Sequence, residues 1–125
     1  MTIEEKIQII KEYKTSVLAA LNSYLDCIYD LTDKYFNENG TLKEGLTHDE
    51  KLETFLLELK SDAKKYEDIR KKIIDEDFNL SLKEINLIAL SFVYVQTSWE
   101  KMIDNLNASI TNIKLIVSQL MEKKS

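Results

Sequence analysis

The sequence predicts an all-α protein, an antiparallel up-down-up bundle of three long helices in a single domain over residues 1–125. Proline is absent and glycine occurs only twice, so few residues interrupt a helix. Apolar residues recur at helical spacing along three stretches. Each stretch also opens with Ser or Thr followed three residues later by Glu, the capping box that begins many helices. A chain of this length can bury a core without a metal or a disulfide.

The first helix is predicted over about residues 3–36. Thr2 and Glu5 form its capping box, and Asn39-Gly40 is expected to end it, because both residues tolerate positive φ. Its apolar stripe advances in steps of three and four residues, as in helical bundles, and only Lys14 interrupts it. The stripe consists of Ile3, Ile7, Ile10, Val17, Leu21, Tyr24, Ile28, Leu31 and Tyr35.

A second helix is predicted over about residues 48–75, with Thr47 and Glu50 as its capping box. Its inner face is formed by Leu52, Phe55, Leu56, Leu59, Ala63, Tyr66, Ile69 and Ile73. The other positions are densely charged with both signs, which is typical of a face in water. The connections before and after this helix are short, which favours antiparallel neighbours and gives the up-down-up order.

The third helix is predicted over residues 82–122, and the bundle is organised around it. Ser81 and Glu84 form its capping box. Every seventh residue from 85 to 120 is apolar, namely Ile85, Phe92, Trp99, Leu106, Ile113 and Leu120. The neighbouring columns of the helical wheel are also mostly apolar, so the helix has a broad apolar stripe that the other two helices are expected to cover.

The last turns of the third helix are expected to extend beyond their neighbours. At ~1.5 Å per residue the three helices are about 50, 42 and 60 Å long. The extending turns are apolar around much of their circumference and need a cover. Three arrangements would cover these turns. In the first, the helix breaks near residues 105–112, which are rich in poor helix formers, and folds back as a fourth helix. In the second the helix pairs with a second copy of the chain, and in the third it binds another protein.

This apolar end provides the candidate partner-binding residues. Trp99 is included because a tryptophan in mid-helix can serve either in a core or as the anchor of an interface. The candidate set is Trp99, Ile110, Ile113, Ile116, Val117, Leu120 and Met121.

The charge balance argues against polyanionic partners. The chain has 22 acidic and 17 basic residues, a net charge of −5. Nucleic acids and anionic membranes are therefore not expected as partners. The charged N-terminal residues lack the apolar core of a signal peptide, and no apolar run is long enough to span a bilayer. A cytoplasmic protein is expected.

The sequence predicts no catalytic site, metal or cofactor. A single histidine, His48, and a single cysteine, Cys27, cannot form a His/Cys zinc site, and no glycine-rich phosphate-binding motif is present. His48 is interpreted as an exposed residue at a helix start and Cys27 as a small buried apolar residue. The one enzymatic alternative is a magnesium-dependent hydrolase, because helical carboxylates suit that ion. Its ligands would be Asp26, Asp30, Asp33 and Glu53.

These observations predict a small, acidic, non-enzymatic protein–protein interaction module that acts through the apolar C-terminal half of its last helix. Its composition is similar to that of adaptors, secretion chaperones, inhibitors and immunity proteins of bacteria and phages, although no motif selects one of these classes. The partner is expected to be another protein or a second copy of the chain. A purely structural homodimer is the alternative that is closest to this hypothesis.

Overall fold

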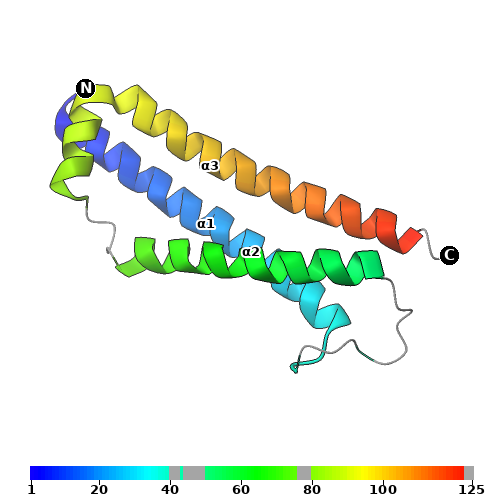
Figure 1. Ribbon diagram of the computed structural model, residues 1–125. Helices are drawn as coiled ribbons and strands as arrows, with labels where there is room; N and C mark the ends of the chain where they lie inside the picture. Colours follow the sequence, from blue (N-terminus) through cyan, green and yellow to red (C-terminus); the bar gives the residue numbers. More distant parts are fainter. Residues whose placement is uncertain (40–42, 44–49, 76–79, 123–125) are drawn as a thin grey trace.

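The computed structural model is a bundle of three helices over the residues that it describes, which are 1–39, 43, 50–75 and 80–122 (Figure 1). Helix α1 spans Ile3–Tyr35, α2 spans Glu50–Asp75 and α3 spans Leu82–Glu122. The chain direction alternates from helix to helix, as the up-down-up prediction requires. The predicted bounds agree with the observed ones within about two residues, and the predicted start at His48 lies outside the described residues.

The helix starts follow the predicted capping boxes. The hydroxyl of Thr2 accepts a hydrogen bond from the Glu5 amide at 3.1 Å, and that of Ser81 accepts one from the Glu84 amide at 3.2 Å. Each bond satisfies an amide that has no partner within the helix. The box at Thr47 lies outside the described residues.

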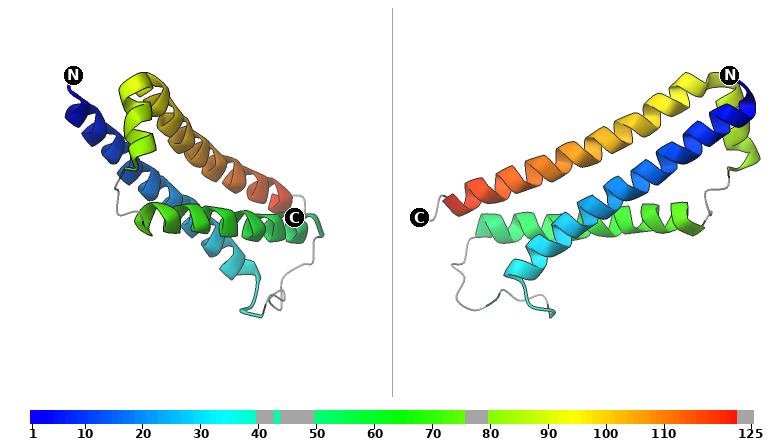
Figure 2. Two further views of the ribbon diagram at one scale, coloured as in Figure 1. Left: turned by 60° about the vertical axis from the view of Figure 1, so that its left-hand side comes forward. Right: turned by 180° about the vertical axis from the view of Figure 1, so that it is seen from behind.

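Helix α1 is the central helix of the bundle. It packs against both α2 and α3, whereas α2 and α3 contact each other only slightly (Figure 2). The stripe predicted for α1 is the centre of the core, since its residues Val17, Leu21 and Ile28 are fully buried, as is Leu25 beside them. The core also contains the following residues of the other two helices: Leu52, Leu56, Leu59, Ala63, Ile73, Leu106, Ile113 and Val117.

Two tyrosines join α1 to α2 inside this core. The rings of Tyr24 and Tyr66 pack edge to face, with their centroids 4.7 Å apart. Burial raises the pKa of Tyr24 to about 12, and the nearby Tyr66 and Asp62 add smaller contributions. The neutral phenol is therefore the form that the folded protein favours.

We expect this tyrosine to make the protein less stable in strong alkali. Tyr24 stays protonated in the folded state up to about pH 12, whereas an unfolded tyrosine ionises near pH ~10. The unfolded state thus binds fewer protons between these values, so the free energy of unfolding falls as the pH rises from about 10 to about 12. A pH titration followed by the absorbance of tyrosinate should show a late step that Tyr24→Phe removes and Tyr94→Phe leaves. A late step that persists in Tyr24→Phe would contradict this assignment.

Helix α3 bends at Ser91, whose backbone is not helical (φ −153°, ψ 65°). The bend divides α3 into a first arm, residues 82–90, and a second arm, residues 92–122. Figure 1 shows the first arm lying across the beginning of α1 and the second arm running along the bundle. Serine is a poor helix former, so a break here costs less than at most positions of the run.

The break considered near residues 105–112 does not occur. Helix α3 continues through this segment, and Ser91 is its non-helical position. Leu106, within the Asn- and Ser-rich segment, and Ile113, directly after it, are buried in the core. Their packing outweighs the weak helix preference of the residues between them, because tertiary contacts commonly override propensity.

The bend also shortens the predicted overhang of α3. The second arm is about 46 Å long at ~1.5 Å per residue, close to the ~50 Å of α1. Its end reaches the beginning of α2, at the end of the bundle opposite the N-terminus (Figure 2). The C-terminal half of α3 therefore lies beside other helices for most of its length. Along the described residues, no helix combines the length and the apolar character that crossing a membrane requires.

Candidate interaction surface at the elbow of the third helix

Five exposed large apolar side chains of the described residues lie within residues 82–94, around the bend of α3. Leu82, Leu87, Leu90, Val93 and Tyr94 are all exposed, and Leu90 is the extreme case at 86%. Elsewhere in the described part, exposed large apolar side chains occur singly or as the pair Leu115 and Ile116. We call these five residues the elbow surface. Monomeric soluble proteins seldom leave so much apolar area uncovered in one place, and such patches commonly mark interaction sites.

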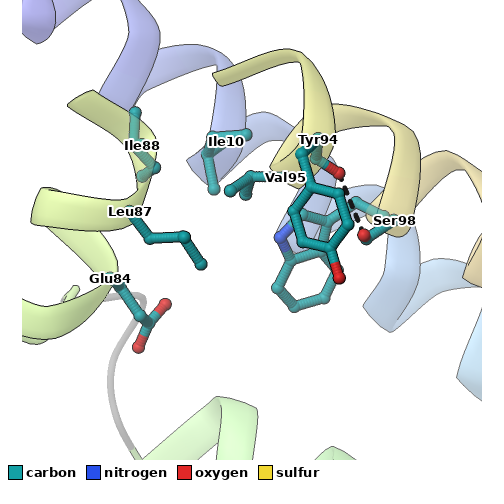
Figure 3. Close-up of a pocket in the computed structure, with 8 residues that line it drawn as sticks. Ile10, Glu84, Leu87, Ile88, Tyr94, Val95 and Ser98 are labelled. Atoms are coloured by element: carbon teal, nitrogen blue, oxygen red, sulfur yellow. Dashed lines mark hydrogen bonds between the residues drawn. The ribbon is translucent and has the colours of Figure 1, made fainter. Parts of the chain in front are cut away.

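A pocket of about 230 Å³ lies in the angle between the two arms of α3. Figure 3 shows Glu84 and Leu87 reaching in from the first arm, Tyr94 and Val95 from the second arm, and Ile10 from α1. Ile88, Ser98 and Trp99 complete the lining. We call this the elbow pocket. It is mostly apolar and opens to solvent next to Leu87 and Tyr94, which also belong to the elbow surface.

The first arm is held in place by apolar packing. Ile88 of the arm and Ile10 of α1 line the same pocket, and each is only 1% exposed. Full burial of an isoleucine side chain contributes about 1.5–3 kcal/mol. A straight α3 would carry Ile88 away from α1 and return both side chains to water. Burial of this pair is therefore the main apolar gain from the bend.

An ion pair holds the same arm at its start. The ammonium of Lys14 lies 3.3 Å from a carboxylate oxygen of Glu84 and 5.9 Å from the centre of the Trp99 ring. Lys14 is the residue that interrupts the predicted stripe of α1, and it is buried. A buried ammonium needs a charged or polar partner, and a position facing Glu84 provides one. Lys14, which interrupts the apolar stripe of α1, therefore lies where the first arm of α3 packs against α1.

A second polar contact joins α1 to the second arm, just past the pocket. The hydroxyl of Tyr13 donates to the Glu100 carboxylate at 2.5 Å and accepts from the Gln96 amide at 3.0 Å. The bond to Glu100 raises the pKa of Tyr13 above its ordinary value, because the neutral phenol is the donor. These bonds join the second arm to α1 through Gln96 and Glu100, which flank Trp99 in the sequence.

The partner-binding residues that the sequence predicts fall mostly inside the monomer. Ile113 and Val117 are each 5% exposed and belong to the core. Trp99, Ile110 and Leu120 are partly buried and pack against it. The side chain of Met121 lies outside the described part of the structure.

Among the predicted residues whose side chains the structure describes, Ile116 alone is exposed, at 37%, beside the exposed Leu115. The other described members of the set are buried or partly buried, because the C-terminal half of α3 runs alongside the other helices. The expectation that Ile113 and Val117 are accessible to a partner was therefore wrong. Binding of a partner through Ile116 stays a prediction. Of the predicted set, Trp99 alone lines the elbow pocket.

The carboxylates of the hydrolase alternative do not gather into a metal site. Asp26, Asp30 and Asp33 are exposed along α1, and Glu53 on α2 is half-buried. A shallow depression brings Asp26 and Asp30 together, but it also contains Lys114, whose positive charge opposes a cation. Within the described residues, no three His, Cys, Asp or Glu side chains are arranged to hold a metal ion.

Cys27 lines the same depression and is half-buried. Burial raises the pKa of its thiol, and this effect outweighs the opposite one of Lys114. The thiol is therefore protonated at neutral pH and is a weak nucleophile. Cys27 was expected to be buried, and the structure instead places it partly buried against the core. His48 lies outside the described residues.

Sequence reasoning missed the elbow surface, although a signal was present. Residues 85–99 form an uncharged run with apolar side chains on all sides of the helical wheel. Leu87, Leu90 and Val93 lie off the stripe that faces α1. A helix that is apolar on all sides needs a cover on all sides.

Comparison with known proteins yields no relative from which a role could be transferred. The function proposed for this chain therefore rests on its own residues and their geometry. The chain matches no protein-family model, no curated protein and no solved structure.

Proposed function

We propose that this chain is a non-enzymatic protein–protein interaction module that binds its partner through the elbow surface of α3. The observation that supports the proposal is the exposure of five large apolar side chains within residues 82–94. These five side chains are not part of the core, because α3 packs against the core through a different set of residues that includes Leu106, Ile113 and Val117. Binding of a partner would remove them from water, at a gain of about 25 cal/mol per Å².

The elbow pocket gives this surface a means of selecting its partner. Interfaces obtain most of their binding energy from a few large side chains that enter well-packed pockets. A cavity of about 150 Å³ accommodates a benzene-sized group, so the elbow pocket, at about 230 Å³, has room for one large apolar side chain. Its walls are preorganised by the burial of Ile88 and by the pair of Lys14 with Glu84. Preorganised walls reduce the entropy that binding costs.

Site-specific photo-crosslinking in cells that produce the protein tests this function. A photoreactive phenylalanine analogue replaces Val93, which is 71% exposed in the elbow surface, or Leu57, an exposed leucine of α2, as the matched control. We expect Val93 to give protein adducts in at least about fivefold higher yield, because a bound partner covers the elbow. The adduct masses distinguish a second copy from a foreign protein. Equal yields at the two positions would contradict the proposal.

A further inference from the structure

We propose that a second copy of this chain covers the elbow surface, in an isologous dimer where apolar side chains of each copy fill the elbow pocket of the other. This inference rests on the proposed function and names its partner. Three properties of the elbow support it: its charge, its area and its shape.

The part of α3 around the bend carries no charge of its own, and the ammonium of Lys6 from α1 lies 5.8 Å from the centre of the Phe92 ring. No charged residue occurs from residue 85 to residue 99, and the carboxylate of Glu84 in the pocket is paired with Lys14. In an isologous contact each patch meets an identical patch, so a central charge would face its own copy. Each chain also has a net charge of −5, and two such chains repel least where both surfaces are neutral. A neutral apolar centre is therefore suited to self-recognition.

The exposed area is sufficient for a dimer. At roughly 200 Å² for a fully exposed large side chain, the exposed fractions of the five side chains correspond to about 680 Å² per copy. Two copies would cover about 1,400 Å² through these residues alone, which lies within the range for stable, specific interfaces. The polar residues around them add to this area.

The shape of the elbow is complementary to its own protrusions. Each copy offers a pocket of about 230 Å³ beside side chains that stand free of the surface, of which Leu90 and Val93 are exposed most fully on either side of the bend. In an isologous pair, residue i of one copy contacts residue j of the other and the reverse holds. One protrusion inserted into the opposite pocket is therefore accompanied by a second, equivalent insertion.

Light scattering coupled to size-exclusion chromatography tests the dimer on the full chain, from micromolar to millimolar concentration. We expect the wild-type mass to rise to twice the 14.6 kDa of one chain. Leu90→Asp should weaken the association at least a hundredfold, because it places a charge in the apolar interface. Its helix content should stay unchanged, since the side chain is exposed in the monomer. Leu57→Asp, the same change on an exposed leucine of α2, should leave the dimer intact.

The fluorescence of Trp99 gives an independent readout, because it is the only tryptophan and it lines the elbow pocket. Dilution of the wild-type dimer should shift its emission to longer wavelength, as water enters the opened pocket. A wild-type chain that stays at 14.6 kDa up to millimolar concentration overturns the dimer. A dimer that survives both Leu90→Asp and Val93→Asp also overturns it, because the interface then lies elsewhere. In either case the crosslinks at Val93 decide separately whether the elbow binds a foreign protein.

Discussion

Ile113→Asp is expected to lower the free energy of unfolding by at least about 4 kcal/mol. Truncation of a buried isoleucine costs about 2–5 kcal/mol, and a carboxylate in an apolar site adds the cost of its lost hydration. Ile113 is 5% exposed and packs in the core that all three helices form. A single domain is usually stable by about 5–15 kcal/mol, so a large part of the population should unfold. Circular dichroism during urea unfolding measures the loss.

Ile116→Asp is the matched control, because it introduces the same charge one turn away on the same helix. Ile116 is 37% exposed, so its carboxylate can stay hydrated. We expect this variant to cost less than about 1 kcal/mol. Equal and large losses in the two variants would mean that the whole circumference of this segment is covered. A stable Ile113→Asp protein would mean that the C-terminal half of α3 does not pack as described.

Lys14→Glu is expected to be the most damaging change of a charged residue, with a loss of about 3–5 kcal/mol. The side chain of Lys14 is 3% exposed, and its ammonium lies 3.3 Å from the Glu84 carboxylate. Glutamate at this position would place two carboxylates together in a site with little water. The first arm should then detach from α1. Urea unfolding measures the stability, and the emission of Trp99 reports whether the elbow pocket opens.

Two further variants separate charge from packing at this position. Lys14→Met keeps a long apolar side chain without the charge, and we expect a change of less than about 1 kcal/mol, because replacement of buried ions by apolar groups is often neutral or stabilising. Exchange of the two charges, Lys14→Glu with Glu84→Lys, should recover part of the loss. If Lys14→Met is as unstable as Lys14→Glu, the contribution of Lys14 depends on contacts other than its charge.

The sequence was sufficient to predict the helices, because the signals that define them are local. The capping residues Thr2 and Ser81 lie within three residues of the amides that they bind. The apolar stripes of the three helices together also identified most of the core, since periodicity shows which side chains need burial. The position of Trp99 between core and interface was left open, and the structure places it in the wall of the elbow pocket.

The bend was not predicted, because its cause is not local. The apolar column that includes Ile85 and Phe92 continues past Ser91 without interruption, and by itself it describes a straight helix. The bend depends instead on Ile88 and Glu84 meeting residues of α1. The periodicity of apolar residues shows which side chains need burial, but it does not show which distant residues will bury them. The apolar end of α3 was therefore assigned to a partner, although α1 and α2 cover most of it.

The first arm of α3 is shorter than a helix that is stable by itself. Isolated helices of fewer than about 12–15 residues are marginal in water, and this arm spans only residues 82–90. Its helical state is therefore conditional on the first turns of α1, which provide Ile10 and Lys14. Binding of a partner at the elbow surface and folding of the first turns of α1 are then linked equilibria. The free energy by which binding stabilises these turns equals the free energy by which their folding strengthens binding. A binding surface of this kind can be weakened by a change in α1 that touches no bound molecule.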